Sequence, residues 1–498
     1  MHSKQTLYHK KARQLIQMEK KRPNILFIMT DQFRADAMSC TGGCAHTPAL
    51  DRLAAEGIRF TQCHTVSPLC VPARVSMMTG LYPHTTGVWK NSDFVLSPDA
   101  NLWVRAIRDS GYATSVFGKL HLHTDYGDFI QREYLVNGYG FETVNEVSGP
   151  HSTCQTRTHM SEEWSKRGLW DMFCEDMLSR SKRPYAKPSP LSPEDYYDTY
   201  VGRKAREYLE QYTDDRPWFC HVSFPGPHEP WDAPKPYSDL YSPEDMPDPL
   251  PRTTDGAPDR PQGEYDKLLQ NPIIQCSNAE SKEIQANYCG SVTLIDDLIG
   301  SIIETIKKRG EWDNTIVLFT SDHGEMNGDH GFVHKRNFFR SAMNIPLIIR
   351  TPDRAKNGGS VNHSLVSLLD VGPTLAEFAG AELNYEQFGK SLCGNIANPE
   401  RVHRDCILGE YACEHMLYDG TWKIALNRQG ETYLLFDEAN DPTEHKNLAA
   451  MPEHRQTDAA LRERLLCAVM QNNRLAPSLL QLAPQSETEA FHRCVAVE

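Results

Sequence analysis

The sequence predicts an α/β fold in which helices sandwich a large mixed, mostly parallel sheet, followed by a smaller α+β domain with an antiparallel sheet. Two observations support this prediction. Continuous apolar runs of strand length, at 24–30, 218–224 and 315–320, alternate with segments of helical pattern. A strand buried on both faces of a parallel sheet has this uninterrupted apolar character. Beyond Gly389 the expected strands are short and follow one another without long helices, which favours an antiparallel sheet.

These changes of pattern also give the expected domain limits. We expect a polar arm over 1–21, the large α/β domain over 22–389, and an α+β subdomain with its tail over 390–498. A chain of 498 residues is long enough for one large domain and a smaller one.

The first half of the large domain begins with the apolar strand 24–30, which ends before Asp31. A helix follows, with Thr47 as its cap, Pro48 in its first turn and Gly57 at its end. Proline loses no hydrogen bond at the first helical position, and glycine readily closes a helix. The strands and helices expected next are 58–64, 70–79, 102–109 and 113–117.

The second half contains the longest predicted helix, 281–308, whose apolar residues recur at helical spacing. Residues 124–195 and 230–275 lack a clear period, and we expect loops with short helices and an extended excursion that shape a pocket. The other elements expected in this half are helices over 192–212 and 370–379 and strands over 218–224, 315–320 and 346–350. The smaller domain should contain strands over 406–409, 422–426 and 433–436 and a helix over 457–471.

Composition and charge limit the partners and the compartment. The net charge of −14 argues against nonspecific binding to nucleic acids or anionic membranes. Residues 1–22 lack the apolar core of a secretion signal, and no later run approaches the roughly 20 apolar residues of a membrane span. The fourteen cysteines are scattered along the chain, so we expect free thiols. We therefore expect a cytoplasmic protein.

The stretch from Leu69 to Gly80, LCVPARVSMMTG, predicts a short helix with Cys70 at its N-terminus. Pro72 suits the first turn, and Gly80 suits the residue that closes the helix. Free backbone N–H groups at a helix N-terminus favour anions, so a nucleophile at Cys70 with Arg74 one turn on would face a tetrahedral oxyanion. The alternative is a buried structural cysteine beside a surface arginine.

Two polar pairs follow buried strands: Asp31-Gln32 and Asp322-His323. Ligand sites of doubly wound sheets lie at the carboxyl ends of strands, so we expect these pairs to converge there. Two carboxylates, an amide oxygen and an imidazole form a site for a divalent cation. The alternative is that these residues only cap turns or helices.

Four basic residues are further candidates. Lys119 and His121 leave one predicted strand two residues apart, which places both side chains on one side of the edge if the extended conformation continues. His228 stands in a Pro-Gly-Pro-His-Glu-Pro loop after strand 218–224, and Lys335 stands in the loop that follows the second polar pair. A lysine can hold an oxyanion and a histidine can transfer a proton. The alternative is a set of solvated or structural residues.

In the order in which they occur, these motifs resemble those of the type I formylglycine-dependent sulfatases of the alkaline phosphatase superfamily. The resemblance runs from about Arg22 to Leu448. It implies that a separate formylglycine-generating enzyme oxidises Cys70 to an aldehyde. It also implies a metal site formed by five residues, which are Asp31, Gln32, Cys70, Asp322 and His323. Oxygen ligands favour Ca²⁺, and the imidazole makes Mn²⁺ the alternative.

Gln32 and His323 depart from the aspartate and asparagine that many sulfatases have at these places. Together with Lys335-Arg336-Asn337-Phe338-Phe339, the Asp31-Gln32 pair looks closest to members that resemble choline sulfatase. Phosphonate monoester hydrolases that resemble this chain typically lack the Gly-Lys-x-His pattern at Lys119 and His121. That pattern therefore favours sulfate esters.

The resemblance implies hydrolysis of a sulfate monoester to an alcohol and inorganic sulfate. The hydrated aldehyde of residue 70 attacks sulfur, assisted by the metal and Asp322 and oriented by Arg74. Lys119, His228 and Lys335 contact the sulfate, His228 or Lys335 protonates the leaving oxygen, and His121 helps to release sulfate.

Several alternatives remain open. The chain is either a sulfatase, a phosphonate monoester or phosphodiester hydrolase with the same nucleophile, or a binding protein with unmodified Cys70. The substrate is expected to be a small-molecule or carbohydrate sulfate ester, with no nucleic-acid or membrane partner. The arm over 1–21 and the tail after Leu475 make a homo-oligomer possible.

Overall fold

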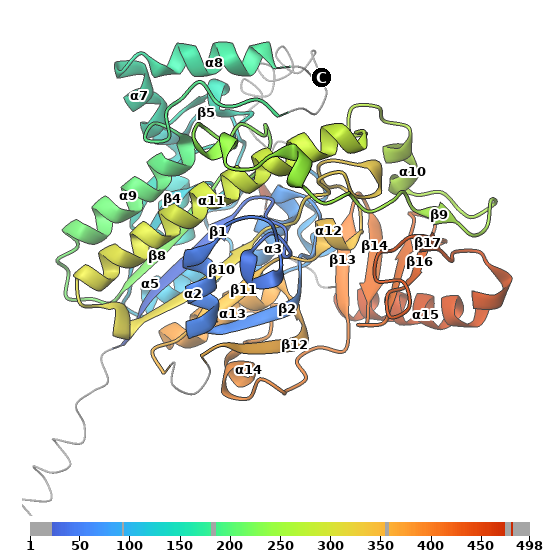
Figure 1. Cartoon of the computed structure of the whole chain (residues 1–498). Helices are drawn as coiled ribbons and strands as arrows, with labels where there is room; N and C mark the ends of the chain where they lie inside the picture. The colour runs from blue at the N-terminus through green and yellow to red at the C-terminus, as the bar shows by residue number, and fades with distance from the viewer. Residues whose placement is uncertain (1–21, 92–93, 181–185, 354–357, 474–479, 482–498) are drawn as a thin grey trace, which may run out of the picture.

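The computed structural model describes residues 22–91, 94–180, 186–353, 358–473 and 480–481, so the predicted arm over 1–21 and most of the tail lie outside the described residues. Its main feature is an eight-stranded sheet with the order β12-β2-β11-β10-β1-β8-β4-β6 (Figure 1). Only β11 runs antiparallel to its neighbours, so the sheet is mixed and mostly parallel, as predicted. The strands are β1 (Asn24–Thr30), β2 (Ile58–His64), β4 (Ala113–Gly118), β6 (Thr143–Glu146), β8 (Trp218–Phe224), β10 (Thr315–Ser321), β11 (Leu347–Arg350) and β12 (Ser360–Ser367).

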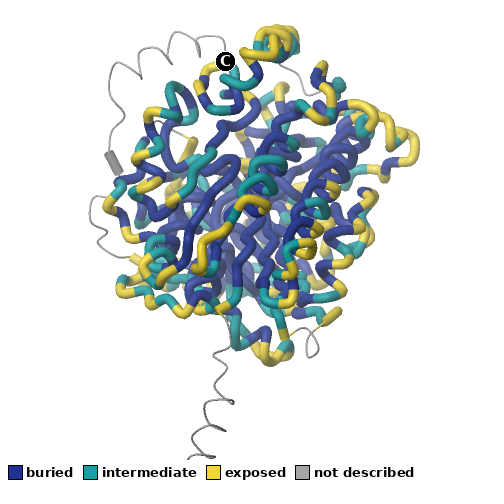
Figure 2. Tube along the Cα trace, turned by 90° about the vertical axis from the view of Figure 1, so that its left-hand side faces the viewer, coloured by how far each residue is buried: buried dark blue, intermediate teal, exposed yellow. Residues whose placement is uncertain are grey.

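Helices cover both faces of this sheet. Alternate residues of β1 enter different cores: Leu26 and Ile28 pack in one cluster, and Ile25 and Phe27 pack in the other. The central strands β1, β8 and β10 are buried along their length (Figure 2), which explains their continuous apolar sequences. The first face carries α2 (Pro48–Glu56), α9 (Tyr197–Gln211) and α11 (Asn278–Lys308). The second carries α3 (Cys70–Thr79), α5 (Trp103–Asp109), α6 (Phe129–Tyr139) and α13 (Val371–Ala379).

The C-terminal part forms a four-stranded antiparallel sheet with the order β13-β14-β15-β16. Its strands are β13 (Ile407–Tyr411), β14 (Glu414–Tyr418), β15 (Trp422–Leu426) and β16 (Thr432–Asp437). Helix α15 (Arg455–Gln471) covers it through Leu461 and Leu465. This confirms the predicted antiparallel sheet and covering helix.

Some elements were not predicted. The region 124–195 contains strand β6 and the eleven-residue helix α6, which corrects the prediction of loops and short helices there. β6 and β12 are the two edge strands of the large sheet, and each leaves part of its residues only half-buried. Edge strands therefore lack the continuous apolar run that identified the central strands.

Shorter elements complete the described chain. Among the described residues, no helix combines the length and the apolar character that crossing a membrane requires. The described cysteines are free thiols, as expected. The remaining helices and strands are α4 (Pro83–Thr86), β3 (Val95–Leu96), β5 (Gly127–Asp128), β7 (Thr156–Arg157), α7 (His159–Lys166), α8 (Leu169–Ser179), β9 (Thr254–Asp255), α10 (Glu264–Leu269), α12 (Arg340–Met343), α14 (Cys393–Ala397), β17 (Lys446–Asn447) and β18 (Leu480–Gln481).

Candidate active site

Asp31 and Asp322 lie side by side because they follow two paired strands. β1 and β10 pair in parallel up to their last residues, so both aspartates leave the same edge of the sheet. The carboxylate of Asp322 is fixed by its neighbours: its Oδ1 accepts hydrogen bonds from the backbone N–H groups of Gln32 (3.0 Å) and His323 (2.9 Å). The strand ends therefore converge as the sequence predicts.

Cys70 begins helix α3 and points at this edge of the sheet. The helix ends at Gly80, which adopts the left-handed φ of 74° expected of a closing glycine. Cys70 Sγ lies 3.1 Å from His323 Nε2 and 3.6 Å from Asp31 Oδ1. One ligand atom from each of Asp31, Cys70, Asp322 and His323 lies within 4.8 Å of the others, and all four residues are buried.

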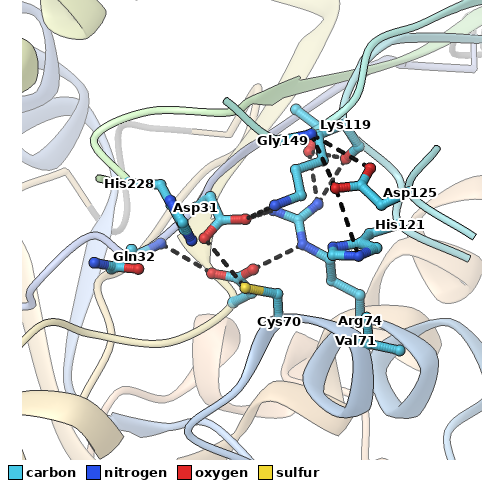
Figure 3. A network of polar contacts seen from close by, with 12 residues as sticks. Asp31, Gln32, Cys70, Val71, Arg74, Lys119, His121, Asp125, Gly149 and His228 are labelled. Atoms are coloured by element: carbon cyan, nitrogen blue, oxygen red, sulfur yellow. Dashed lines mark hydrogen bonds and ion pairs between the residues drawn. The ribbon is translucent and has the colours of Figure 1, made fainter. Parts of the chain in front are cut away.

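Arg74, one turn into α3, joins the two aspartates (Figure 3). Its Nε lies 2.7 Å from Asp322 Oδ2, and its Nη2 lies 3.2 Å from Asp31 Oδ2. Its Nη1 donates to the carbonyl oxygen of Lys119 (2.6 Å) and to Ser223 Oγ (3.1 Å). The guanidinium is thus buried and saturated, so it fixes the site rather than reaching for a substrate. The interpretation of a surface arginine is wrong.

The charges of the cluster formed by Asp31, Cys70, Asp322 and His323 suit a divalent cation. Burial by itself raises the pKa of Asp31, but Lys119, His228 and Arg74 outweigh it and hold this pKa well below its usual range. Burial lowers the pKa of His323, but the charge of Asp322 together with the charge and the hydrogen bond of Cys70 outweighs burial and raises this pKa to about 9. The pocket therefore stabilises a positive charge at His323. Two carboxylates and an imidazole are a donor set for Ca²⁺ or Mn²⁺, so these residues fit the predicted metal.

Lys119 and His121 lie on one side of the site (Figure 3), but strand alternation does not place them there, because β4 ends at Gly118 and His121 adopts a left-handed φ of 60°. Lys119 Nζ lies 2.8 Å from Asp31 Oδ2, and His121 Nε2 lies 3.8 Å from Asp125 Oδ2. Asp125 itself is held by Ser152, whose hydroxyl donates to Oδ2 at 2.6 Å. Burial first, and then the charge of Lys119, lowers the pKa of His121 well below its usual value. His121 is therefore a neutral imidazole that can accept a proton.

His228 and Lys335 meet beside the first group. Lys335 Nζ donates to His228 Nε2 at 2.7 Å, and His228 Nδ1 donates to the carbonyl oxygen of Glu229, also at 2.7 Å. These contacts assign the proton to Nδ1 of His228 and leave its Nε2 as an acceptor. Burial lowers the pKa of His228 well below its usual value, although the charge of Glu229 opposes this. Lys335 is the group of this pair that carries a proton.

The side chain of Gln32 lies in this second group. Its Nε2 donates to Glu229 Oε2 at 2.6 Å and also to Glu325, and its Oε1 accepts a hydrogen bond from Lys335. The contacts of its amide therefore go to Lys335 and the two glutamates, although its backbone contacts Asp322. Its role as a metal ligand stays a prediction.

Sequence reasoning missed three acids of the site: Asp125, Glu229 and Glu325. Glu229 follows His228 directly, and Glu325 lies two residues after His323, so each adjoins a recognised motif. Burial raises the pKa of Glu325 to about 7, whereas His228 and Lys335 overcome burial and hold the pKa of Glu229 well below its usual range. Only the fold shows that both carboxylates turn toward Gln32.

Comparisons with known proteins identify the family of this chain. The family model described as Sulfatase matches residues 23–381, and the model described as N-sulphoglucosamine sulphohydrolase, C-terminal, matches residues 328–473. The arylsulfatase of Clostridium perfringens is 29% identical, over 89% of this chain and 94% of that protein. The choline-sulfatase of Rhizobium meliloti is 31% identical, over 86% of this chain and 83% of that protein.

A solved structure supports the fold. The phosphonate monoester hydrolase of Agrobacterium radiobacter matches with a TM-score of 0.72 at 24% identity, covering 93% of this chain and 100% of that chain. The Sulfatase model spans the Cys70 helix and both strand-end pairs, and the resemblance read from the motifs is confirmed. The chain therefore belongs to the sulfatase family and is a sulfuric ester hydrolase.

Proposed function

We propose that this enzyme hydrolyses a sulfate monoester through a formylglycine formed from Cys70 and with the aid of one divalent cation. The observation that carries the proposal is the position of Cys70 Sγ, 3.1 Å from His323 Nε2 and 3.6 Å from Asp31 Oδ1. A nucleophile at the position of Cys70 Sγ faces the residues that would ligate the cation. Arg74 holds both aspartates in place. Asp31, Asp322 and His323 would hold the cation, with Ca²⁺ as the first choice and Mn²⁺ as the alternative.

The roles of the chain's own groups follow from their protonation. When bound, the cation supplies positive charge opposite the sulfate oxygens, and residue 70, once oxidised to formylglycine, supplies the nucleophile. The ammonium groups of Lys119 and Lys335 bind the sulfate oxygens from two sides. Lys335 carries the proton for the leaving oxygen, because its partner His228 is an acceptor at Nε2.

His121 is the proton acceptor of the proposed mechanism. Its low pKa makes it a neutral base, and it lies on the Lys119 side of the nucleophile, whereas His228, the partner of Lys335, lies on the other side (Figure 3). Proton donor and proton acceptor are therefore separate groups, which suits a covalent mechanism with two successive steps. The first step needs an acid at the leaving oxygen, and the second needs a base at residue 70.

The substrate class is proposed from the relatives. The N-acetylglucosamine-6-O-sulfatase of Bacteroides thetaiotaomicron is 27% identical over 78% of this chain. This relative supports a carbohydrate sulfate ester, whereas the choline-sulfatase supports a small alcohol ester. A phosphonate monoester or phosphodiester is the alternative substrate, and similarity over most of the chain to a multifunctional alkaline phosphatase superfamily protein of Trinickia caryophylli favours including it.

The first test is the mass of the proteolytic peptide that contains residue 70, from protein expressed together with a formylglycine-generating enzyme. We expect a peptide that has lost its sulfur and reacts as an aldehyde. An unmodified thiol under these conditions would contradict the proposal. The protein that carries the aldehyde should then cleave an aryl sulfate faster than the corresponding aryl phosphonate. Faster cleavage of the phosphonate would favour the phosphonate alternative.

A further inference from the structure

Three potential metal-ligating side chains meet where the large domain contacts the C-terminal sheet, whose strands β13 and β14 are labelled in Figure 1. His84 lies on α4, Glu410 on β13 and His415 on β14, and one ligand atom of each lies within 4.8 Å of the other two. Glu410 and His415 face each other as cross-strand partners. His84 Nδ1 lies 2.5 Å and His415 Nδ1 lies 3.5 Å from the same atom, Glu410 Oε1. These residues are separate from the catalytic group.

The carboxylate of Glu410 lacks a permanent positive partner. Glu410 is 1% exposed, and within the described part of the chain its ion-pair partners are His84 and His415, with no lysine or arginine among them. A buried carboxylate is costly unless a cation compensates it. Imidazoles provide that charge only when protonated, and burial opposes the protonation of His84 even though Glu410 raises its pKa overall. The positive charge beside Glu410 is therefore supplied either by a proton on an imidazole or by a metal ion.

The second nitrogen of His84 is arranged as in metal-bound histidines. Its Nε2 lies 3.1 Å from the carbonyl oxygen of Asn472, just beyond the end of α15. Histidine ligands commonly donate this second N–H to a backbone carbonyl, which orients the ring and fixes its tautomer. With the proton on Nε2, the lone pair of Nδ1 points toward Glu410.

His415 supplies a second nitrogen atom, Nδ1, to this cluster. Its Nδ1 is buried and makes no hydrogen bond with any described residue, although it lies near Glu410 Oε1. Trp89 packs against the ring edge-on, with the centroids 5.7 Å apart, and so limits its rotation. Two imidazole nitrogens therefore converge on one carboxylate oxygen.

We propose that His84, Glu410 and His415 bind a divalent first-row transition metal, with Zn²⁺ as the ion to test. Two imidazoles and a carboxylate, completed by water, are a ligand set for Zn²⁺ and its neighbours rather than for Ca²⁺. The side chains of His84 and His415 are 10% and 24% exposed, which gives an ion access from solvent.

The bound ion would join parts that are distant in the sequence. Helix α4 lies four residues after α3, the helix that begins with Cys70. Thr85, also on α4, donates to the same Asn472 carbonyl at 3.2 Å. The ion would therefore hold the segment after the nucleophile helix against β13, β14 and the end of α15, as a structural clamp without a part in the chemical step.

The test uses the full chain, stripped with a chelator and then saturated with Ca²⁺ to occupy the catalytic group. Zn²⁺ is added, unbound metal is removed by gel filtration, and the retained zinc is measured by atomic emission. We expect the wild type to retain one equivalent of zinc more than His415→Ala, and to gain melting temperature on zinc addition where the variant does not. Equal zinc in both proteins would overturn the proposal.

Two further variants keep this test sharp. His415→Gln retains a polar side chain and serves if the alanine variant does not fold; it should lose the same equivalent. His159→Ala is the matched control, because His159 Nε2 lies 2.7 Å from Glu133 Oε1 in a half-exposed pair that, among the described residues, includes no second histidine. This control should retain the wild-type amount of zinc. A loss in His159→Ala equal to that in His415→Ala would show adventitious binding and contradict the site.

Discussion

Arg74 Nε lies 2.7 Å from Asp322 Oδ2, and this contact links the nucleophile helix to the end of β10. The same guanidinium reaches Asp31, so one side chain bridges the carboxylates that follow two neighbouring strands. Each of the three side chains is almost completely buried. The position of Cys70 relative to the expected metal ligands therefore depends on Arg74, which lies one turn further along the same helix and bridges the two aspartates.

The first prediction concerns this bridge. Arg74→Lys should lower kcat by about 10²-fold or more, because a single ammonium cannot reproduce the two-sided contact of a guanidinium. Arg74→Ala should also lower the free energy of unfolding of the metal-free protein by about 3–5 kcal/mol, since it leaves the buried Asp322 without its arginine partner, whereas Asp31 keeps Lys119. Steady-state kinetics and urea unfolding with chelator present measure the two effects.

A surface ion pair provides the control for Arg74. Arg203 contacts Glu163 and Glu207 at 2.6 and 3.0 Å on partly exposed side chains. Arg203→Ala should change the free energy of unfolding by less than about 1 kcal/mol and leave kcat unchanged. If Arg74→Ala behaved in the same way, the bridge would have no structural role.

The second prediction concerns His323 and pH. Its pKa in the folded, metal-free protein with unmodified Cys70 is about 9, above the ordinary value of 6.5. Its protonation therefore stabilises the metal-free fold fully below pH 6.5, and this stabilisation is lost as the pH rises through about 9. A cation needs the neutral imidazole, so binding near pH 7.5 should release close to one proton and affinity should rise with pH up to about 9.

Calorimetry in two buffers with different enthalpies of ionisation measures this proton release. His323→Asn is the informative control, because an amide oxygen still ligates a hard cation but carries no titrating proton. This variant should bind Ca²⁺ with no linked proton release from position 323. Equal proton release in the wild type and His323→Asn would contradict the assigned protonation state.

The third prediction concerns Lys335 as the proton donor. Lys335→Met should lower kcat/KM by roughly 10²–10³-fold, the effect of removing one strong donor from a site of developing charge. The loss should be larger for an alkyl sulfate than for an aryl sulfate with an acidic alcohol, because only the poor leaving group needs protonation. Lys282→Met, which removes a surface pair with Asp248, is the control. Equal losses for both substrates would exclude Lys335 as the donor.

The sequence predicted those site residues whose position follows from local rules. Asp31 and Asp322 come directly after apolar strands, and Cys70 stands beside a proline at a helix start, so strand and helix ends located them. Glu229 and Glu325 depend on contacts between loops nearly a hundred residues apart, and nothing in the local pattern shows which way a glutamate in a loop turns. The edge strand β12 was missed for another reason: its residues are only partly buried, so its sequence lacks a continuous apolar run.

The last prediction concerns Cys70 itself. Cys70→Ala should reduce turnover by at least roughly 10³-fold, the order expected when a covalent nucleophile is removed, and should leave the fold intact. Cys63, buried on β2, is the matched control: Cys63→Ala removes a similarly buried thiol but should keep catalytic activity. Kinetics on an aryl sulfate, with circular dichroism to verify folding, measure both variants. Normal turnover by Cys70→Ala would remove the nucleophile from the mechanism, whereas inactivity of both variants would point to loss of packing instead. Loss in Cys70→Ala alone, together with an aldehyde in the wild-type peptide, would tie the chemistry to residue 70.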